Sequence, residues 1–168
     1  LDVLTGVEGK LRIHLCGSLQ SLEGLENLIY VYKLSIGSVP HLKNLDPLSG
    51  LATIESELRI GNNDSLVSIS ALTGVTPSNY IYIGNSQLQN LHGLDSIKDF
   101  DGTIVIQGND SITSLAGLEG LESVSGGLGI INNGNLANLD VLQNLNYSSV
   151  PLMSISNNDQ LTDLNGLI

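Results

Sequence analysis

Leucine and isoleucine recur along the 168-residue chain at intervals of 23 to 25 residues. The most regular series is a run of isoleucines at Ile13, Ile36, Ile60, Ile83, Ile106, Ile130 and Ile155. Another apolar residue stands two positions before each of them, and this alternation ("LRI", "IYI", "IVI") is typical of a short strand that buries every second side chain. It predicts strands near residues 11–13, 34–36, 58–60, 81–83, 104–106, 128–130 and 153–155.

After each predicted strand, three more leucine or isoleucine positions follow at or close to a spacing of three residues, for example Leu66, Ile69 and Leu72. Residues three apart eclipse one another in a 3₁₀ turn, so this spacing predicts 3₁₀ turns and short corners. A period of this length is the signature of stacked coils. We expect a single solenoid domain over residues 1–168 with about seven coils, a parallel sheet on one side and 3₁₀ turns on the other.

The two ends of the chain align with the inside of a repeat. The opening "LDVLTGVEGKL" superposes on "LEGLESVSGGL" at 118–128, and Ile168 also falls in mid-repeat. Because natural solenoids carry polar caps, this pattern predicts a segment of a longer array.

A polar series interrupts the apolar pattern three residues after the repeated isoleucine. Its members are Cys16, Asn63, Asn109, Asn133 and Asn158. The chain turns there, and an asparagine amide can replace the sheet partners that the backbone loses. We predict a buried structural ladder, with irregular corners in the second repeat at Val39-Pro40 and in the fourth, where Asn85 and Ser86 compete for the place.

A second polar series lies between the leucines. It consists of Ser21, Asn44, Ser68, Asn90, Ser114, Asn138 and Asp163. Short polar side chains of this kind form hydrogen bonds with nearby backbone and favour turns, which predicts a structural role for them.

The segments "LRIGNNDSLVSISALTGV" and "IVIQGNDSITSLAGLEGLESVSGGLGI" resemble the repeat units of receptor L domains, and they are similar to leucine-rich repeats of the internalin kind. The resemblance covers the whole chain. It implies a right-handed solenoid that serves as an extracellular or surface-exposed recognition or adhesion module. The chain departs from receptor L domains in lacking their cysteines, since Cys16 is its single one.

The charge balance limits the partners. Seventeen Asp and Glu face six Lys and Arg, which gives a formal net charge of −11. This charge argues against nucleic acid or an anionic membrane as a partner. No apolar run approaches the roughly 18 residues of a membrane span, so we expect no direct membrane insertion.

Basic and aromatic residues gather on the predicted outer face of the sheet. The candidates for partner binding are Lys10, Arg12, His14, Lys33, Arg59, Tyr80 and Tyr82. Guanidinium groups and tyrosine rings favour an acidic or carbohydrate partner. The alternative is that these residues only keep an open sheet soluble. The later strands offer small, weakly polar residues, a composition that suits contact with a neighbouring chain.

The sequence offers little enzymatic chemistry. The three histidines fall at unrelated repeat positions, and no phosphate-binding loop follows a strand, so we expect no enzyme, no cofactor and no metal site. "DFDG" at 99–102 begins like a calcium loop but lacks the later ligands, and calcium at the acidic back stays an open alternative. Sequons occur at Asn63, Asn109 and Asn146, and Asn146 is the candidate for glycosylation because the other two belong to the ladder.

The sequence therefore favours a non-enzymatic extracellular recognition or adhesion module that binds a protein or carbohydrate partner through its sheet face. The competing hypothesis is a structural element that self-assembles into an extracellular filament or coat.

Overall fold

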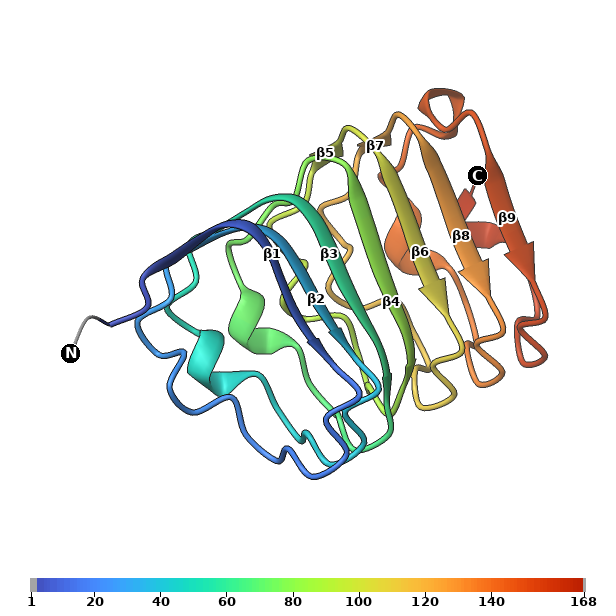
Figure 1. Ribbon diagram of the computed structural model, residues 1–168. Helices are drawn as coiled ribbons and strands as arrows, with labels where there is room; N and C mark the ends of the chain where they lie inside the picture. The colour runs from blue at the N-terminus through green and yellow to red at the C-terminus, as the bar shows by residue number, and fades with distance from the viewer. Residues whose placement is uncertain (1–2, 168) are drawn as a thin grey trace.

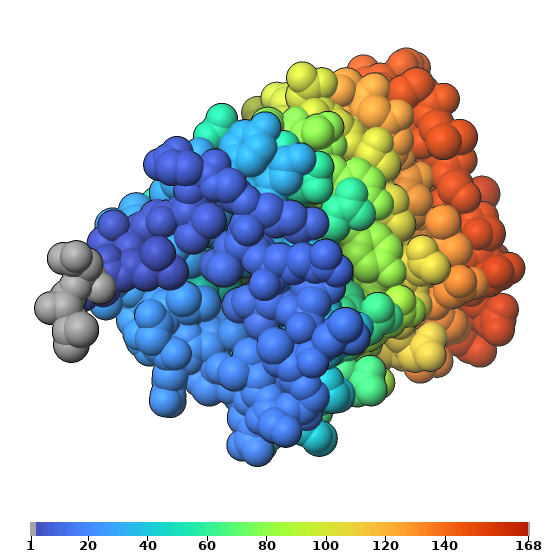
Figure 2. Space-filling view, in the orientation of Figure 1, coloured from blue at the N-terminus to red at the C-terminus, as the bar shows by residue number. Residues whose placement is uncertain are grey.

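The computed structural model describes residues 3–167 and shows a parallel β-solenoid. Seven strands form one sheet in the order β1-β2-β3-β4-β6-β8-β9, so each coil adds its strand beside that of the preceding coil. The strands are β1 Gly6–His14, β2 Tyr30–Gly37, β3 Thr53–Asn63, β4 Tyr80–Ser86, β6 Thr103–Gln107, β8 Gly127–Ile131 and β9 Met153–Ser156. The sheet occupies one side of the molecule (Figure 1), and the coils stack in chain order (Figure 2).

The register of the sheet is the register of the sequence repeat. Ile13 pairs with Ile36, Ile36 with Ile60, and the series continues strand by strand to Ile155. A slip of one residue would move every buried side chain of a strand to the solvent face. Each predicted strand position lies within one of the seven strands of this sheet.

The side opposite the sheet is built from 3₁₀ turns and corners. These are η1 Asp46–Leu48, η2 Ser70–Leu72, η3 Asp140–Leu142 and η5 Asn165–Leu167, at matching places in their repeats, and η4 Tyr147–Ser149 in an irregular corner. The period of three residues thus predicted the local structure correctly. A second, two-stranded sheet pairs β5 Asp99–Phe100 with β7 Ser123–Val124, whose residues are 24 positions apart and so follow the repeat.

The interior between the two sides is almost entirely aliphatic. Inward residues of the middle strands and turns, such as Leu58, Ile83 and Leu115, are fully buried. Within the described residues Phe100 is the one buried aromatic side chain. Leucine and isoleucine of nearly constant size let successive coils repeat the same packing, which is why a single geometry extends through the stack.

The asparagine series lies in the turn after each strand and bridges neighbouring coils. Asn133 Nδ2 donates to the carbonyl of Ile106 at 3.0 Å, and its Oδ1 accepts from the backbone N–H of Asn109 at 3.1 Å. Asn158 repeats this geometry one coil further on, with 2.9 Å to the carbonyl of Ile130 and 2.9 Å from the N–H of Asn133. Each amide therefore satisfies two backbone groups of the preceding coil.

The corner of the second repeat is regular, so the expectation of irregularity there was wrong. Val39 takes the buried ladder place and donates its N–H to Asn63 Oδ1 at 3.0 Å, while Asn63 Nδ2 donates to the carbonyl of Ile36 at 3.2 Å. The backbone at each corner is bonded by the asparagine of the next coil and not by the residue at its own ladder position. An apolar residue, Val39, is therefore tolerated at the ladder position of the second repeat.

The corner of the fourth repeat is one residue short and is irregular, as predicted. Ser86 occupies the buried place and donates to the carbonyl of Gly84, whereas Asn85 is exposed. Pairing of β4 with β3 extends as far as Ser86, which keeps its backbone in the sheet. Within the described residues Asn109 Oδ1 is consequently a buried acceptor without a hydrogen-bond partner.

A backbone conformation with positive φ recurs one residue before the ladder position of each repeat. Two residues after each repeated isoleucine the backbone has a positive φ, between 51° and 68°, in every coil. The residues are Leu15, Ser38, Asn62, Asn85, Gly108, Asn132 and Asn157. Asparagine and glycine adopt this region at low cost, and they fill most of these places because the chain must bend sharply there.

The second polar series forms the predicted backbone bonds. In all seven coils the side-chain oxygen accepts from the backbone N–H two residues later, at 2.9 to 3.4 Å. These bonds lie at the start of the turns on the side opposite the sheet.

The ladder predicts a specific cost for Asn133→Ala. The variant leaves the carbonyl of Ile106 and the N–H of Asn109 buried without partners, and each such loss costs about 1–3 kcal/mol. We expect the free energy of unfolding, measured by urea denaturation, to fall by about 2–6 kcal/mol. Asn144→Ala, which removes an exposed amide bond to the carbonyl of Glu119, is the matched control and should change it by less than about 0.5 kcal/mol. Equal effects of the two variants would contradict the ladder's role.

Candidate binding surface

The outward side chains of the sheet form three rows that run across the strands. The first row is Lys10, Lys33, Glu57, Tyr80, Thr103 and Gly127; the second is Arg12, Ser35, Arg59, Tyr82, Val105, Gly129 and Ser154; the third is His14, Gly37, Gly61, Gly84, Gln107, Ile131 and Ser156. All seven residues predicted for partner binding lie on β1 to β4 of this surface. We call the part of the surface on these four strands the cationic half.

Glu57 organises the middle of the cationic half. Its carboxylate accepts from Lys33 Nζ at 2.7 Å and from Arg59 Nε at 3.3 Å. The hydrogen bond from Lys33, aided by the one from Arg59, lowers the pKa of Glu57 against the opposing effect of burial. One carboxylate thus holds two cations in place, and the three groups together keep one net positive charge.

Arg59 also lies over an aromatic ring. Its guanidinium carbon is 4.1 Å from the centre of the Tyr80 ring, within the range of a cation–π contact. The Arg59 side chain remains 43% exposed. The guanidinium is therefore held by Glu57 and Tyr80 and still open to solvent.

Two rings bound a depression whose floor is formed by glycine. A Cβ atom on Gly37 would lie 3.1 Å from His14 Cε1, and one on Gly61 would lie 2.8 Å from Tyr82 Cε1. The His14 ring thus lies against β2, and the Tyr82 ring reaches across Gly84 to Gly61. The depression has a volume of about 190 Å³, and its lining includes both rings, Ser35 and Arg59.

The surroundings of His14 favour its neutral form over the imidazolium. Its Nδ1 lies 3.4 Å from Arg12 Nη2, which can only donate, so Nε2 carries the proton and donates to Ser35 Oγ at 2.8 Å. Partial burial, followed by the charges of Arg12 and Lys10, lowers the pKa of His14. Protonation at Nδ1 would replace the bond to Arg12 with a repulsion between two cations.

Tyr82 is fixed from the opposite side. Asn85 Nδ2 donates to its hydroxyl oxygen at 3.2 Å, and burial, together with the neighbouring Tyr80, raises the pKa of Tyr82. The hydroxyl therefore keeps its proton and can donate it to a bound group.

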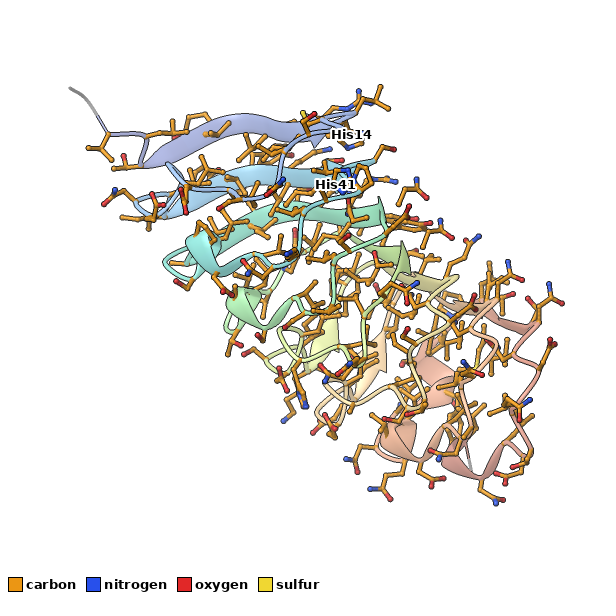
Figure 3. All side chains as sticks on the ribbon, turned by 90° about the horizontal axis from the view of Figure 1, so that it is seen from below. His14 and His41 are labelled. Atoms are coloured by element: carbon orange, nitrogen blue, oxygen red, sulfur yellow. The ribbon has the colours of Figure 1, made fainter. Side chains whose placement is uncertain are left out.

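A second hollow adjoins the depression where the strands end. It has a volume of about 420 Å³ and is lined by Leu15, Gly17, Ser38, Pro40, Asn62 and Asp64. Ser38 and Asn62 also line the first depression, so the two hollows lie side by side at this corner. His14 and His41 both lie in the first coils of the stack (Figure 3), but His41 is exposed and lines neither hollow.

The later part of the sheet surface is different in character. Val105, Gly129, Ile131 and Leu152 line a small apolar trough of about 150 Å³, and Leu152 is 69% exposed. The lining residues lie on β6, β8 and β9 or directly beside them. This trough matches the expected weakly polar composition of the later strands.

Several residues of the site were not singled out from the sequence. The alternation of the strand places Glu57 on the outer face, but its role depends on its ion pairs with Lys33 of the neighbouring strand and Arg59 of its own strand. Asn62 and Asn85 belong to the series with positive φ, which the recurrence of asparagine and glycine two residues after the isoleucine could have indicated.

The sequons differ in accessibility. Asn63 and Asn109 are fully buried in the ladder, whereas Asn146 is exposed at the start of η4 and accepts from the backbone N–H of Ser148 at 3.2 Å.

Within residues 3–167 no group of three or more His, Cys, Asp or Glu side chains is arranged to hold a metal ion. No helix in that same range is long and apolar enough to cross a membrane. The fold and the surface define a parallel β-solenoid with a cationic patch on its sheet. Compared with known proteins, the chain matches no family, no curated protein and no solved structure.

The environment of His14 predicts a shifted titration. We expect the midpoint of His14, measured by NMR, to lie below its ordinary value of 6.5 and to move upward in Arg12→Gln, because a neighbouring positive charge is removed. Since the folded state binds the proton less tightly than the unfolded chain, stability is lost as the pH falls from 6.5 through the lowered midpoint. Lys98→Gln, which removes a charge next to Glu122 instead, should leave the midpoint unchanged. A wild-type midpoint above 6.5 would contradict this description.

Proposed function

We propose that the protein is a non-enzymatic recognition or adhesion module that acts outside the cell or at its surface and binds an anionic protein or carbohydrate partner through the cationic half of its sheet. One observation carries the proposal. Four of the six basic residues, Lys10, Arg12, Lys33 and Arg59, lie together on one surface of a chain whose net charge is −11.

The charge distribution favours such a partner physically. Strands β1 to β4 carry four cations and three carboxylates, Glu8, Glu55 and Glu57, and within the described residues Lys10 and Arg12 have no carboxylate partner. A positive patch attracts an anionic partner and orients it, while the acidic remainder repels it from other surfaces. The same acidic remainder disfavours nucleic acid, so we propose none as a partner.

We further propose that the solenoid is right-handed and of the leucine-rich-repeat or receptor L-domain kind. The repeat of 23 to 25 residues, the parallel sheet and the asparagine ladder support this assignment. If the protein passes through a glycosylating secretory pathway, Asn146 is the sequon that we propose to carry sugar.

A second candidate function is self-assembly. The apolar trough beside Ile131 and Leu152 favours it, because an exposed apolar surface gains stability when a second copy of the chain covers it. The trough alone is small, so a stable contact would need to extend along the sheet to bury roughly 1,200 Å² or more.

The recognition hypothesis predicts a charge-dependent loss of binding. Arg12→Gln/Arg59→Gln removes two positive charges without placing a second carboxylate beside Glu57. On immobilised panels of acidic peptides, carboxylated and sulfated glycans, and neutral glycans, we expect the wild type to retain anionic members and the variant to lose at least about tenfold in affinity. The control Lys43→Gln/Lys98→Gln carries the same net charge with the surface intact and should bind like the wild type. Unchanged binding by the arginine variant, or no retention of any anionic probe, would contradict the proposal.

The self-assembly hypothesis predicts a different outcome. Ile131→Lys places a charge in the trough, and burying it in a contact between copies would be unfavourable. If the trough mediates assembly, the molar mass from light scattering rises with concentration for the wild type and stays monomeric for this variant. A concentration-independent monomer mass for the wild type would exclude self-assembly through this surface.

A further inference from the structure

The depression between His14 and Tyr82 is the right size for one ring. Its volume of about 190 Å³ is smaller than the roughly 300–1,000 Å³ of pockets that enclose drug-sized ligands. The absence of side chains at Gly37 and Gly61 makes room for the two rings, which limit the depression on either side. A single flat or puckered ring fits a depression of this volume.

Hydrogen-bonding groups surround this space. Arg59 uses Nε for Glu57, and within the described residues its two Nη groups form no hydrogen bond. Tyr82 accepts from Asn85 and retains its own hydroxyl proton, whereas Ser35 is buried and its Oγ is bonded to His14. The planar Nη pair suits a carboxylate, and the Tyr82 hydroxyl suits a hydroxyl group of a sugar.

We infer that the depression binds a uronic acid unit of an acidic polysaccharide, with the sugar carboxylate on the Nη groups of Arg59 and a ring hydroxyl near Tyr82. This inference deepens the proposed function and rests on it. A sugar ring combines an apolar face with a polar rim, and the site offers an aromatic ring and a bare backbone floor within a rim of donors.

The adjoining hollow extends the site to a second sugar unit. Ser38 and Asn62 line both hollows, so a chain leaving the depression passes over the corner into the larger space. Leu15 and Pro40 offer apolar contacts there, and Asp64 repels a second carboxylate. The arrangement fits a polysaccharide in which a uronic acid alternates with a neutral sugar.

The test uses the tetrasaccharide that alternates glucuronic acid with N-acetylglucosamine, titrated into the full chain by calorimetry and by NMR. Comparison probes are the corresponding disaccharide, a neutral N-acetylglucosamine tetramer, a galacturonic acid tetramer and hexaglutamate. We expect the alternating tetrasaccharide to bind at least about tenfold more tightly than the neutral tetramer, which lacks the carboxylate, and more tightly than the disaccharide. The galacturonic acid tetramer should bind more weakly than the alternating tetrasaccharide, because its second carboxylate would lie next to that of Asp64.

Three variants examine the position of the sugar. Arg59→Gln removes the carboxylate contact, Tyr82→Ala removes one side of the depression, and Gly61→Val displaces the Tyr82 ring, against which its Cβ would clash. Each should reduce affinity by about tenfold or more, while Lys98→Gln should leave it unchanged. NMR spectra of each variant report whether the fold is retained, and Arg59→Gln and Tyr82→Ala alter only outward side chains.

The results separate this inference from the proposed function. Hexaglutamate binding that Arg12→Gln/Arg59→Gln abolishes, with no binding of the tetrasaccharide, would overturn the sugar site and leave recognition through the cationic half intact. Tetrasaccharide binding that Tyr82→Ala and Gly61→Val leave unchanged would also overturn it, because the sugar would then lie elsewhere. Failure of every anionic probe would overturn both.

Discussion

The structure depends on satisfying the backbone where each coil leaves the sheet. At that corner the chain bends through a residue with positive φ, and the next residues face the interior with backbone groups that no strand can pair. The side-chain amides of Asn63, Asn133 and Asn158 form hydrogen bonds with these backbone groups in the coil before their own. Stability and register are therefore properties of neighbouring coils taken together, which is why the fold is a stack rather than a set of independent units.

The same register builds the candidate binding surface. When Ile13, Ile36 and Ile60 are paired in the core, the residues between and beside them are paired on the outside. Residues about 24 positions apart, such as Lys33 and Glu57, then meet at 2.7 Å. A linear repeat is thereby converted into a two-dimensional surface whose composition varies from coil to coil while its backbone does not.

That variation separates two kinds of chemistry on one sheet. The first four strands carry cations, aromatic rings and a row of glycines, and the later strands carry Val105, Gly129 and Ile131. Hydrogen bonds and ion pairs hold the first region in a defined shape, as His14 between Arg12 and Ser35 illustrates. Binding at a surface organised in advance loses less conformational entropy, which supports a role in recognition.

The sequence by itself determined the repeat, the strand positions, the 3₁₀ turns and the outer face. Apolar residues that alternate indicate strands, apolar residues spaced by three indicate turns, and both sets must bury their side chains in one core between them. It also indicated the buried asparagines, since an amide among leucines needs backbone partners. Three features were decided only by the tertiary structure. Val39 donates its N–H to Asn63 of the next coil, Asn85 is exposed and donates to Tyr82, and the rings of His14 and Tyr82 lie over Gly37 and Gly61. These features depend on side-chain rotamers and contacts between coils, which a pattern read along one chain does not contain.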